Sequence, residues 1–323
     1  MPVPARPRRA LVASALGTSL LLSGCGLGQE AASDAVTGPF TFGFVNGGTT
    51  KFHTCLQAAV EAEAKNYRVR LYTADSHQDA ATELTNIKEM IAKKVDALIV
   101  QTVDVHALDD DIARAKASGI PIFLTSVVPD DTSGLLGAVV VDLKKVGSLD
   151  AGWIDEDAAG KDVQVGIVAG APGAASDLLV GGFKGALPAN AEVVATGAGM
   201  FDPGRAREVA KGMIKDHPDL DYAFVANEEM AFAVRKAFDA AGAEDVRIVT
   251  VNGTDEALAA LKDGRFSATV ANSAADTGAL AVTNAVDLLR EDDRVDRIAR
   301  TSLRLVTKDN ADTAPLYCPS DDL

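Results

Sequence analysis

Short runs of apolar and β-branched residues recur along the chain, with helical patterns between them. Five such runs lie in the first half, at 40–45, 69–73, 97–100, 120–125 and 137–141, and five in the second, at 163–168, 193–196, 222–225, 246–251 and 268–271. Between them, apolar residues recur at helical spacing, as in Leu56, Ala59, Val60 and Ala64. Many of the strand-like runs are apolar throughout, which is typical of parallel strands covered by helices on both faces. Because ten strands are many for one sheet, the pattern predicts an α/β protein with two doubly wound parallel-sheet lobes.

Several helix ends are predicted by single residues. Asp104 and Asp202 stand where N-caps are expected, and Pro203 follows at a first helical position. Gly119 and Gly242 stand where helices are expected to end.

The first 25 residues have the layout of an export signal. Arg6, Arg8 and Arg9 precede an apolar stretch at 10–22, and Leu22-Ser23-Gly24-Cys25 follows. These four residues resemble the lipobox of bacterial lipoproteins, in which the cysteine is lipidated. The sequence therefore predicts a signal peptide over 1–24, a lipid anchor at Cys25 that holds the exported protein on the outer face of the cell membrane, and a flexible tether over 25–38. The alternative is an ordinary cleaved signal that happens to end near a cysteine.

The charge and the cysteines narrow the class of protein further. The 323 residues carry a net charge of −15, from 31 Lys and Arg against 46 Asp and Glu. No cluster of basic residues follows the first ten residues, which argues against nucleic acid as a partner. Outside the cytoplasm, an even pair of cysteines favours a Cys55–Cys318 disulfide that fastens the C-terminal tail to an early helix. Two buried thiols are the alternative.

Motifs for catalysis and metal binding are missing from the sequence. The four histidines lack metal-ligand spacing, and neither a G-x-S-x-G elbow nor a phosphate-binding P-loop is present. Acidic pairs such as Glu228-Glu229 are adjacent and do not face each other on a helix. We therefore expect no metal, no cofactor and no enzymatic activity.

Three segments resemble a known family. Residues 217–231 end in Asn227-Glu228-Glu229-Met230-Ala231, residues 248–254 end in Asn252-Gly253-Thr254, and residues 119–122 read Gly-Ile-Pro-Ile. In order and spacing they resemble the ribose-binding type of periplasmic sugar-binding protein, which serves ABC importers (type I periplasmic binding proteins). The resemblance implies a three-crossing hinge near residues 141–142, 273 and 301. Lobe one would then comprise 39–141 plus 274–299, and lobe two 142–273 plus 300–323.

The resemblance also implies a ligand site between the lobes, where amide and aromatic side chains meet a sugar. Asn227 matches the family's sugar-binding asparagine. Ser126-Val127 stands where the family usually has Asp-Arg, and Asp177 stands where an arginine is usual. The chain's own chemistry adds Asn46, since amides at strand ends both donate to and accept from hydroxyls. The predicted ligand-binding residues are Asn46, Lys51, Phe52, Ser126, Asp177, Phe201, Asn227, Asn252 and Asn272.

The expected function is capture of a small polyhydroxylated ligand, a sugar, polyol or cyclitol, by a monomer that delivers it to an ABC permease. A second possibility is a ligand sensor that feeds a signalling receptor. A third is an amine-bearing ligand, which Asp177 would attract.

Overall fold

The computed structural model describes residues 39–292 and 294–319, and this part of the chain belongs to one compact unit. The predicted signal peptide, the tether and Cys25 lie outside the described residues. No helix within them is both long enough and apolar enough to span a membrane.

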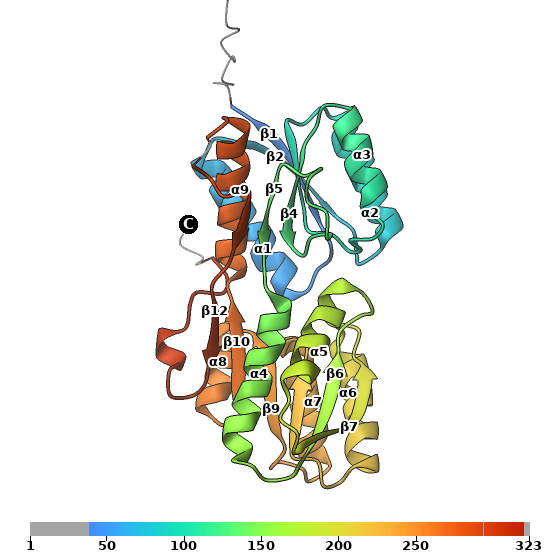
Figure 1. Cartoon of the computed structure of the whole chain (residues 1–323), viewed down its shortest axis with the longest axis vertical. Coiled ribbons are helices and arrows are strands. Elements are labelled where there is room, and N and C mark those ends of the chain that lie inside the picture. The colour runs from blue at the N-terminus through green and yellow to red at the C-terminus, as the bar shows by residue number, and fades with distance from the viewer. Residues whose placement is uncertain (1–38, 293, 320–323) are drawn as a thin grey trace, which may run out of the picture. The chain divides into compact units, whose positions relative to one another are not determined.

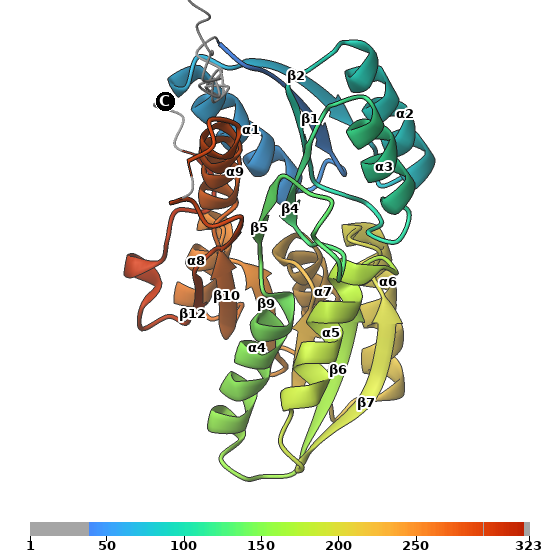
Figure 2. The same ribbon diagram turned by 45° about the horizontal axis from the view of Figure 1, so that its top comes forward.

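The first lobe is built on a six-stranded parallel sheet with the strand order β11-β5-β4-β3-β1-β2. Strands β1, β2, β4 and β5 of this sheet are labelled in Figure 1 and Figure 2. Its strands are β1 (Thr41–Asn46), β2 (Arg70–Asp75), β3 (Ala97–Val100), β4 (Ile122–Ser126), β5 (Gly137–Val140) and β11 (Ile298–Arg300). Its helices are α1 (Lys51–Asn66), α2 (Ala80–Ala92), α3 (Asp109–Ala117) and α9 (Ala274–Leu289). Alternate residues of β1 point to opposite faces: Phe44 packs with residues of α1 and α9, and Val45 packs with residues of α2 and α3.

The second lobe repeats this plan with the strand order β12-β10-β9-β8-β6-β7. Its strands are β6 (Val163–Ala169), β7 (Ala191–Ala198), β8 (Tyr222–Val225), β9 (Arg247–Asn252), β10 (Ala268–Asn272) and β12 (Leu303–Val306), of which only β12 is antiparallel to its neighbour. Its helices are α4 (Leu143–Ala158), α5 (Ala174–Ala186), α6 (Pro203–Asp216), α7 (Glu228–Ala240), α8 (Asp255–Lys262) and the short 3-10 helix η1 (Ala311–Thr313). The predicted fold class is confirmed.

The chain passes from one sheet to the other between β5 and α4, between β10 and α9, and between β11 and β12. After β12 it crosses once more. Tyr317 packs against Cys55 of α1 and Ala274 of α9, and a disulfide joins Cys318 to Cys55. The assignment of all of 300–323 to lobe two is therefore wrong for the end of the tail, because that bond holds it against the first lobe.

The helix ends agree with the predicted ones in all but one case. Asp202 Oδ1 accepts a hydrogen bond from Arg205 N (2.7 Å), so Asp202 is the N-cap of α6. Gly119 and Gly242 follow α3 and α7 with φ of 72° and 75°. Asp104 is not a helix cap: its Oδ1 accepts from His106 N (2.9 Å) in a local turn, and α3 begins only at Asp109.

Candidate ligand-binding site

A cavity of about 180 Å³ lies where the carboxyl ends of the strands of both lobes meet. Its first-lobe lining is Gly47, Thr50, Phe52, His53, Gln78, Gln101, Thr102, Val103 and Ser126, and the crossing adds Val141. Its second-lobe lining is Leu143, residues 171–176, Leu179, Phe201, Ala226, Asn227, Val251, Asn252 and Asn272. Such an edge, with the chain crossing between two parallel sheets, is where α/β folds commonly bind ligands.

The structure brings six of the nine predicted residues together around this cavity. They are Phe52, Ser126, Phe201, Asn227, Asn252 and Asn272.

The other three, Asn46, Lys51 and Asp177, lie outside the lining. Asn46 Nδ2 donates to His53 O (3.0 Å) and so supports the start of α1. Asp177 lies in the first turn of α5, but its side chain is exposed and points away from the cavity residues Ser176 and Leu179. Neighbouring helical residues are rotated by about 100°, so one position decides which side chain faces the cavity.

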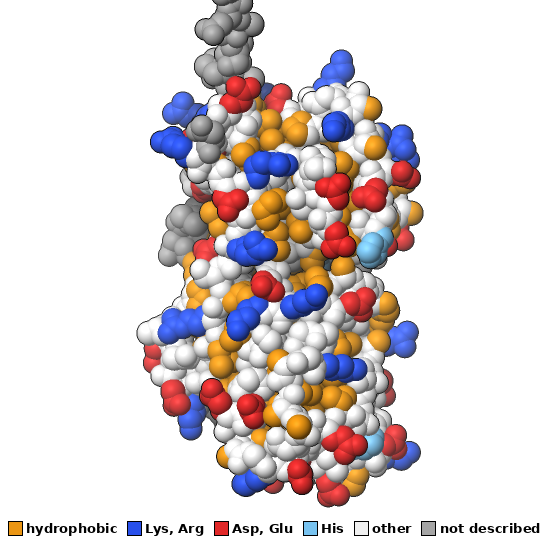
Figure 3. Space-filling model, viewed as in Figure 1, with side chains coloured by type: hydrophobic (Ala, Val, Ile, Leu, Met, Phe, Trp, Pro, Cys, Tyr) orange, Lys and Arg blue, Asp and Glu red, His pale blue; other side chains and the backbone are white. Residues whose placement is uncertain are grey.

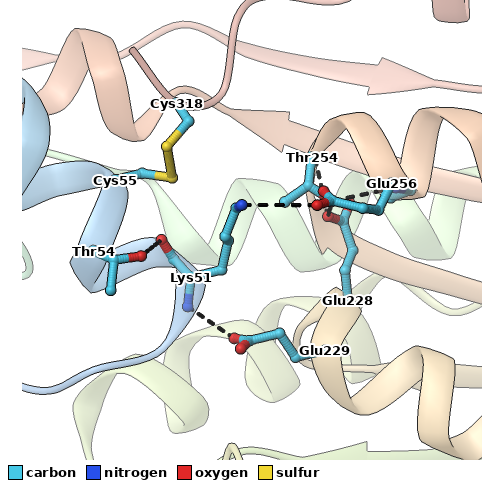
Figure 4. Close-up of polar contacts among 9 residues, drawn as sticks. Lys51, Thr54, Cys55, Glu228, Glu229, Thr254, Glu256 and Cys318 are labelled. Carbon is cyan, nitrogen blue, oxygen red and sulfur yellow. Dashed lines mark hydrogen bonds and ion pairs between the residues drawn. A yellow bond between two sulfur atoms is a disulfide. The ribbon is translucent and has the colours of Figure 1, made fainter. Parts of the chain in front are cut away.

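Lys51 joins the lobes beside the cavity (Figure 4). Its backbone N donates to Glu229 Oε2 (3.0 Å), which caps the start of α1 from the second lobe. Its Nζ lies 3.7 Å from Glu256 Oε1, another carboxylate of the second lobe. Lys51 is therefore a contact between lobes rather than a cavity residue.

Three asparagines lie at the carboxyl ends of the neighbouring strands β8, β9 and β10: Asn227 follows β8, and Asn252 and Asn272 are the last residues of β9 and β10. Asn227 Oδ1 accepts from Met230 N (2.9 Å) and caps α7. Asn272 Oδ1 is buried and has no hydrogen-bond partner among the described residues. Within that same part of the chain, no Nδ2 atom of Asn227, Asn252 or Asn272 donates a hydrogen bond, so three amide donors remain for a ligand.

The first-lobe side is held by hydrogen bonds after β3. Gln101 Oε1 accepts from Gly47 N (3.0 Å), and Thr102 Oγ1 donates to Glu83 Oε1 (2.8 Å). Glu83 also accepts from Val103 N (2.7 Å), and its burial raises the pKa of the carboxyl to about 7. These bonds fix the loop that presents Gln101 and Thr102 to the cavity.

His53 is a cavity residue that the sequence did not identify. Burial lowers its pKa to about 4, so the ring is neutral at pH 7, and its Nδ1 lies 2.8 Å from Thr50 Oγ1. Five more polar cavity residues were also missed: Thr50, Gln78, Gln101, Thr102 and Ser176. Gln101 and Thr102 directly follow the apolar run at 97–100, the same signal that identified the asparagines.

Four non-glycine residues that line the cavity have strained backbone conformations. Gln78, Ser126, Phe201 and Asn252 have φ of 58°, 71°, 53° and 138°, which non-glycine residues seldom adopt. Each such residue costs on the order of 1–3 kcal/mol, and strain of this kind clusters at functional sites.

Gly170 gives the Phe201 ring its place at the cavity. A Cβ at this position would lie 2.1 Å from the Phe201 ring, so the ring packs directly against the backbone of Gly170. The aromatic face at this end of the cavity therefore depends on a glycine beneath it.

No cluster of three or more metal-ligating side chains occurs in the described ranges.

Comparisons with known proteins identify the family and its fold. The family model described as "periplasmic binding protein domain" matches residues 42–293. The ribose import binding protein of Bacillus subtilis (strain 168) is 30% identical over 262 residues, covering 80% of this chain and 83% of that protein. A xylitol-binding protein of Mycolicibacterium smegmatis is 26% identical, covering 94% and 86%. A solute-binding protein of an ABC transporter from Bacillus halodurans C-125, solved with bound myo-inositol, superposes with a TM-score of 0.80 at 25% identity, covering 85% and 97%.

Proposed function

The chain belongs to the periplasmic binding protein family, and we propose that it captures a small polyhydroxylated solute, a sugar, polyol or cyclitol, and delivers it to an ABC importer. The main supporting observation is the cavity between the lobes, where the amide donors of Asn227, Asn252 and Asn272 have no hydrogen-bond partner among the described residues. Similarity to proteins named for ribose and xylitol, and to a structure holding myo-inositol, supports the same ligand class.

Binding needs no covalent step. Each amide can donate to one hydroxyl and accept from another, which suits a polyol. Phe52 and Phe201 offer apolar faces to the C–H groups of the ligand. The crossings near residues 141–142, 273 and 301 act as a hinge, and the contacts of Lys51 with Glu229 and Glu256 form as the lobes close.

Members of this family act outside the cytoplasm, and they bind solutes. For this chain we also propose export through a signal peptide over 1–24, a lipid anchor at Cys25 and action as a monomer. The sequence Leu22-Ser23-Gly24-Cys25 supports the anchor. One chain supplies both walls of the cavity, which supports a monomer. Cys25→Ser should release the protein from the membrane fraction or leave it unprocessed, and unchanged attachment would exclude the anchor.

The test of solute binding is a ligand screen on the purified full-length protein in detergent. D-ribose, D-xylose, D-glucose, D-galactose, xylitol and myo-inositol are tested by thermal unfolding and then by calorimetry. A ligand at 100 times its Kd adds about 2.7 kcal/mol of stability, which raises Tm by roughly 5–10 °C for a protein of this size. If no member of the panel binds, the proposed ligand class is wrong.

A further inference from the structure

The cavity carries no formal charge at neutral pH. Among the described residues that line it, none is Asp, Glu, Lys or Arg, although the chain contains 77 of these four types (31 + 46). His53 is the one titratable residue in that lining, and its ring is neutral at pH 7. Figure 3 shows where charge lies instead: Lys, Arg, Asp and Glu are interspersed over the viewed surface.

Three charged residues near the cavity either have partners in the protein or have an exposed side chain outside the lining. Lys51 Nζ pairs with Glu256, and Glu83 accepts hydrogen bonds from Thr102 and Val103 behind the lining. The exposed Asp177 lies in the first turn of α5, where its carboxylate offsets the positive end of that helix. None of these groups is positioned to neutralise a charge on a ligand.

The two sides of the cavity differ in polarity. Ala171, Pro172, Ala174, Ala175, Leu179 and Leu143 form an apolar wall at the start of α5 and α4, which we call the α5 wall. The polar side chain of this wall is Ser176, whose Oγ accepts a hydrogen bond from Gly170 N (3.1 Å). The other polar side chains come from the first lobe and from the ends of β8, β9 and β10. A ligand with one hydroxyl-rich face and one C–H-rich face would match both sides.

The size of the cavity limits the ligand as well. A cavity of roughly 150 Å³ holds benzene, with its six heavy atoms. At about 180 Å³, this cavity is slightly larger, which suits a small single-ring ligand.

We propose that the cavity selects an uncharged sugar or polyol, places a C–H-rich or deoxy face against the α5 wall, and rejects amine and acid analogues. This inference rests on the proposed function and names its ligand class. An ammonium or carboxylate group bound here would lose part of its water without gaining a counter-charge, which disfavours binding. The amine-bearing ligand suggested by Asp177 is thereby disfavoured, because that carboxylate lies outside the cavity.

The first experiment measures Kd by calorimetry for matched ligand series on the full-length protein in detergent. The D-glucose, D-galactose and D-ribose series each contain the parent sugar, its terminal-deoxy derivative, an amino-deoxy derivative and the aldonate. In a series that binds, we expect the amine and the acid to bind at least 100-fold more weakly than the parent. The deoxy derivative should bind within threefold of the parent or more tightly.

The outcomes separate the two proposals. A charged member that binds as tightly as its neutral parent, or that binds when no neutral member does, overturns neutral selection and leaves solute binding intact. A deoxy derivative that loses more than tenfold overturns the placement of its face against the α5 wall. If no member of any series binds, the proposed function fails, and the inference fails with it.

The second experiment places a carboxylate in the α5 wall. Ala175→Asp changes the second residue of α5, and Ala81→Asp makes the same change at the second residue of α2, outside the cavity lining. Acidic residues are tolerated in the first turn of a helix, so both variants should fold. We expect Ala175→Asp to weaken the tightest neutral ligand at least tenfold and to raise the preference for its amine analogue at least tenfold, whereas Ala81→Asp changes neither by more than twofold. A folded Ala175→Asp protein with unaltered preference would contradict the α5 wall, and the wild-type series decides neutral selection even if this variant does not fold.

Discussion

Replacing Asn227 by alanine removes two interactions made by one side chain. Its Oδ1 caps α7 through Met230 N, and its Nδ2 is available to the ligand. Loss of an N-cap costs about 1 kcal/mol, within a range of about 0.5–2, so Tm should fall by roughly 2–4 °C. A ligand hydroxyl left unpaired costs about 1–3 kcal/mol, which corresponds to a roughly five- to 150-fold loss of affinity.

Asn227→Ser separates the two effects. Serine caps helices about as well as asparagine, so stability should stay within about 0.5 kcal/mol of the wild type. Because serine lacks the amide donor, the affinity should fall about as far as in Asn227→Ala. This variant also adds no charge beside Glu228, which is buried directly after Asn227.

Asp202→Ala is the matched control for the cap. Asp202 caps α6 through Arg205 N, is exposed and does not line the cavity. We expect it to lose about 1 kcal/mol of stability with no change in Kd. Thermal unfolding and calorimetry with the tightest ligand of the panel measure both quantities. Wild-type affinity in both Asn227 variants would show that this amide does not touch the ligand, and an equal loss of stability in Asn227→Ser and Asn227→Ala would refute the role of the cap.

Three further predictions concern neighbouring parts of the molecule. Gly170→Ala should displace the Phe201 ring and weaken ligand binding roughly two- to tenfold in calorimetry, and unaltered affinity would show that the ring does not pack on the ligand. Burial lowers the pKa of His53 from 6.5 to about 4. The unfolded protein therefore binds a proton at this residue at a higher pH than the folded protein does. The free energy of unfolding should be highest above pH 6.5 and should fall by no more than about 3 kcal/mol as the pH falls to about 4. Denaturant titrations at several pH values should show this loss in the wild type and not in His53→Gln. If the free energy of unfolding depends on pH in the same way in both proteins, this prediction is wrong. Replacing Cys55 and Cys318 together by serine should cost about 2–5 kcal/mol of unfolding free energy, and a wild-type Tm that does not respond to dithiothreitol would argue against the bond.

The fold could be predicted because its central strands, such as β3, β4 and β8, are short, buried and largely apolar runs, a composition typical of parallel strands covered on both faces. The strands β11 and β12 were not predicted, because they are short and only partly buried. The strand-end residues Asn227, Asn252 and Asn272 could be predicted for a related reason: a polar residue that follows a buried run lies at the edge where ligands bind. Asp177 could not be placed in this way. A resemblance aligns the start of a helix but does not fix which face points inward, and Ser176 and Leu179 take the positions toward the cavity.

The C-terminal tail shows how two sequence predictions constrained each other. The resemblance assigned residues 300–323 to lobe two, whereas the parity of the cysteines predicted a bond between Cys318 and Cys55 in a first-lobe helix. A disulfide requires Cα atoms about 4.4–6.8 Å apart, so the bond is compatible with a lobe-two position only for the first part of the tail, and the chain must cross back to lobe one before Cys318. In the structure the two Cα atoms lie 4.8 Å apart, and Ser273 Oγ donates to Leu316 O beside the hinge (2.7 Å). Because Ala311 still packs in the second-lobe core, the tail crosses between residues 311 and 317. The disulfide, rather than the resemblance to the family, therefore predicts where the end of the tail lies.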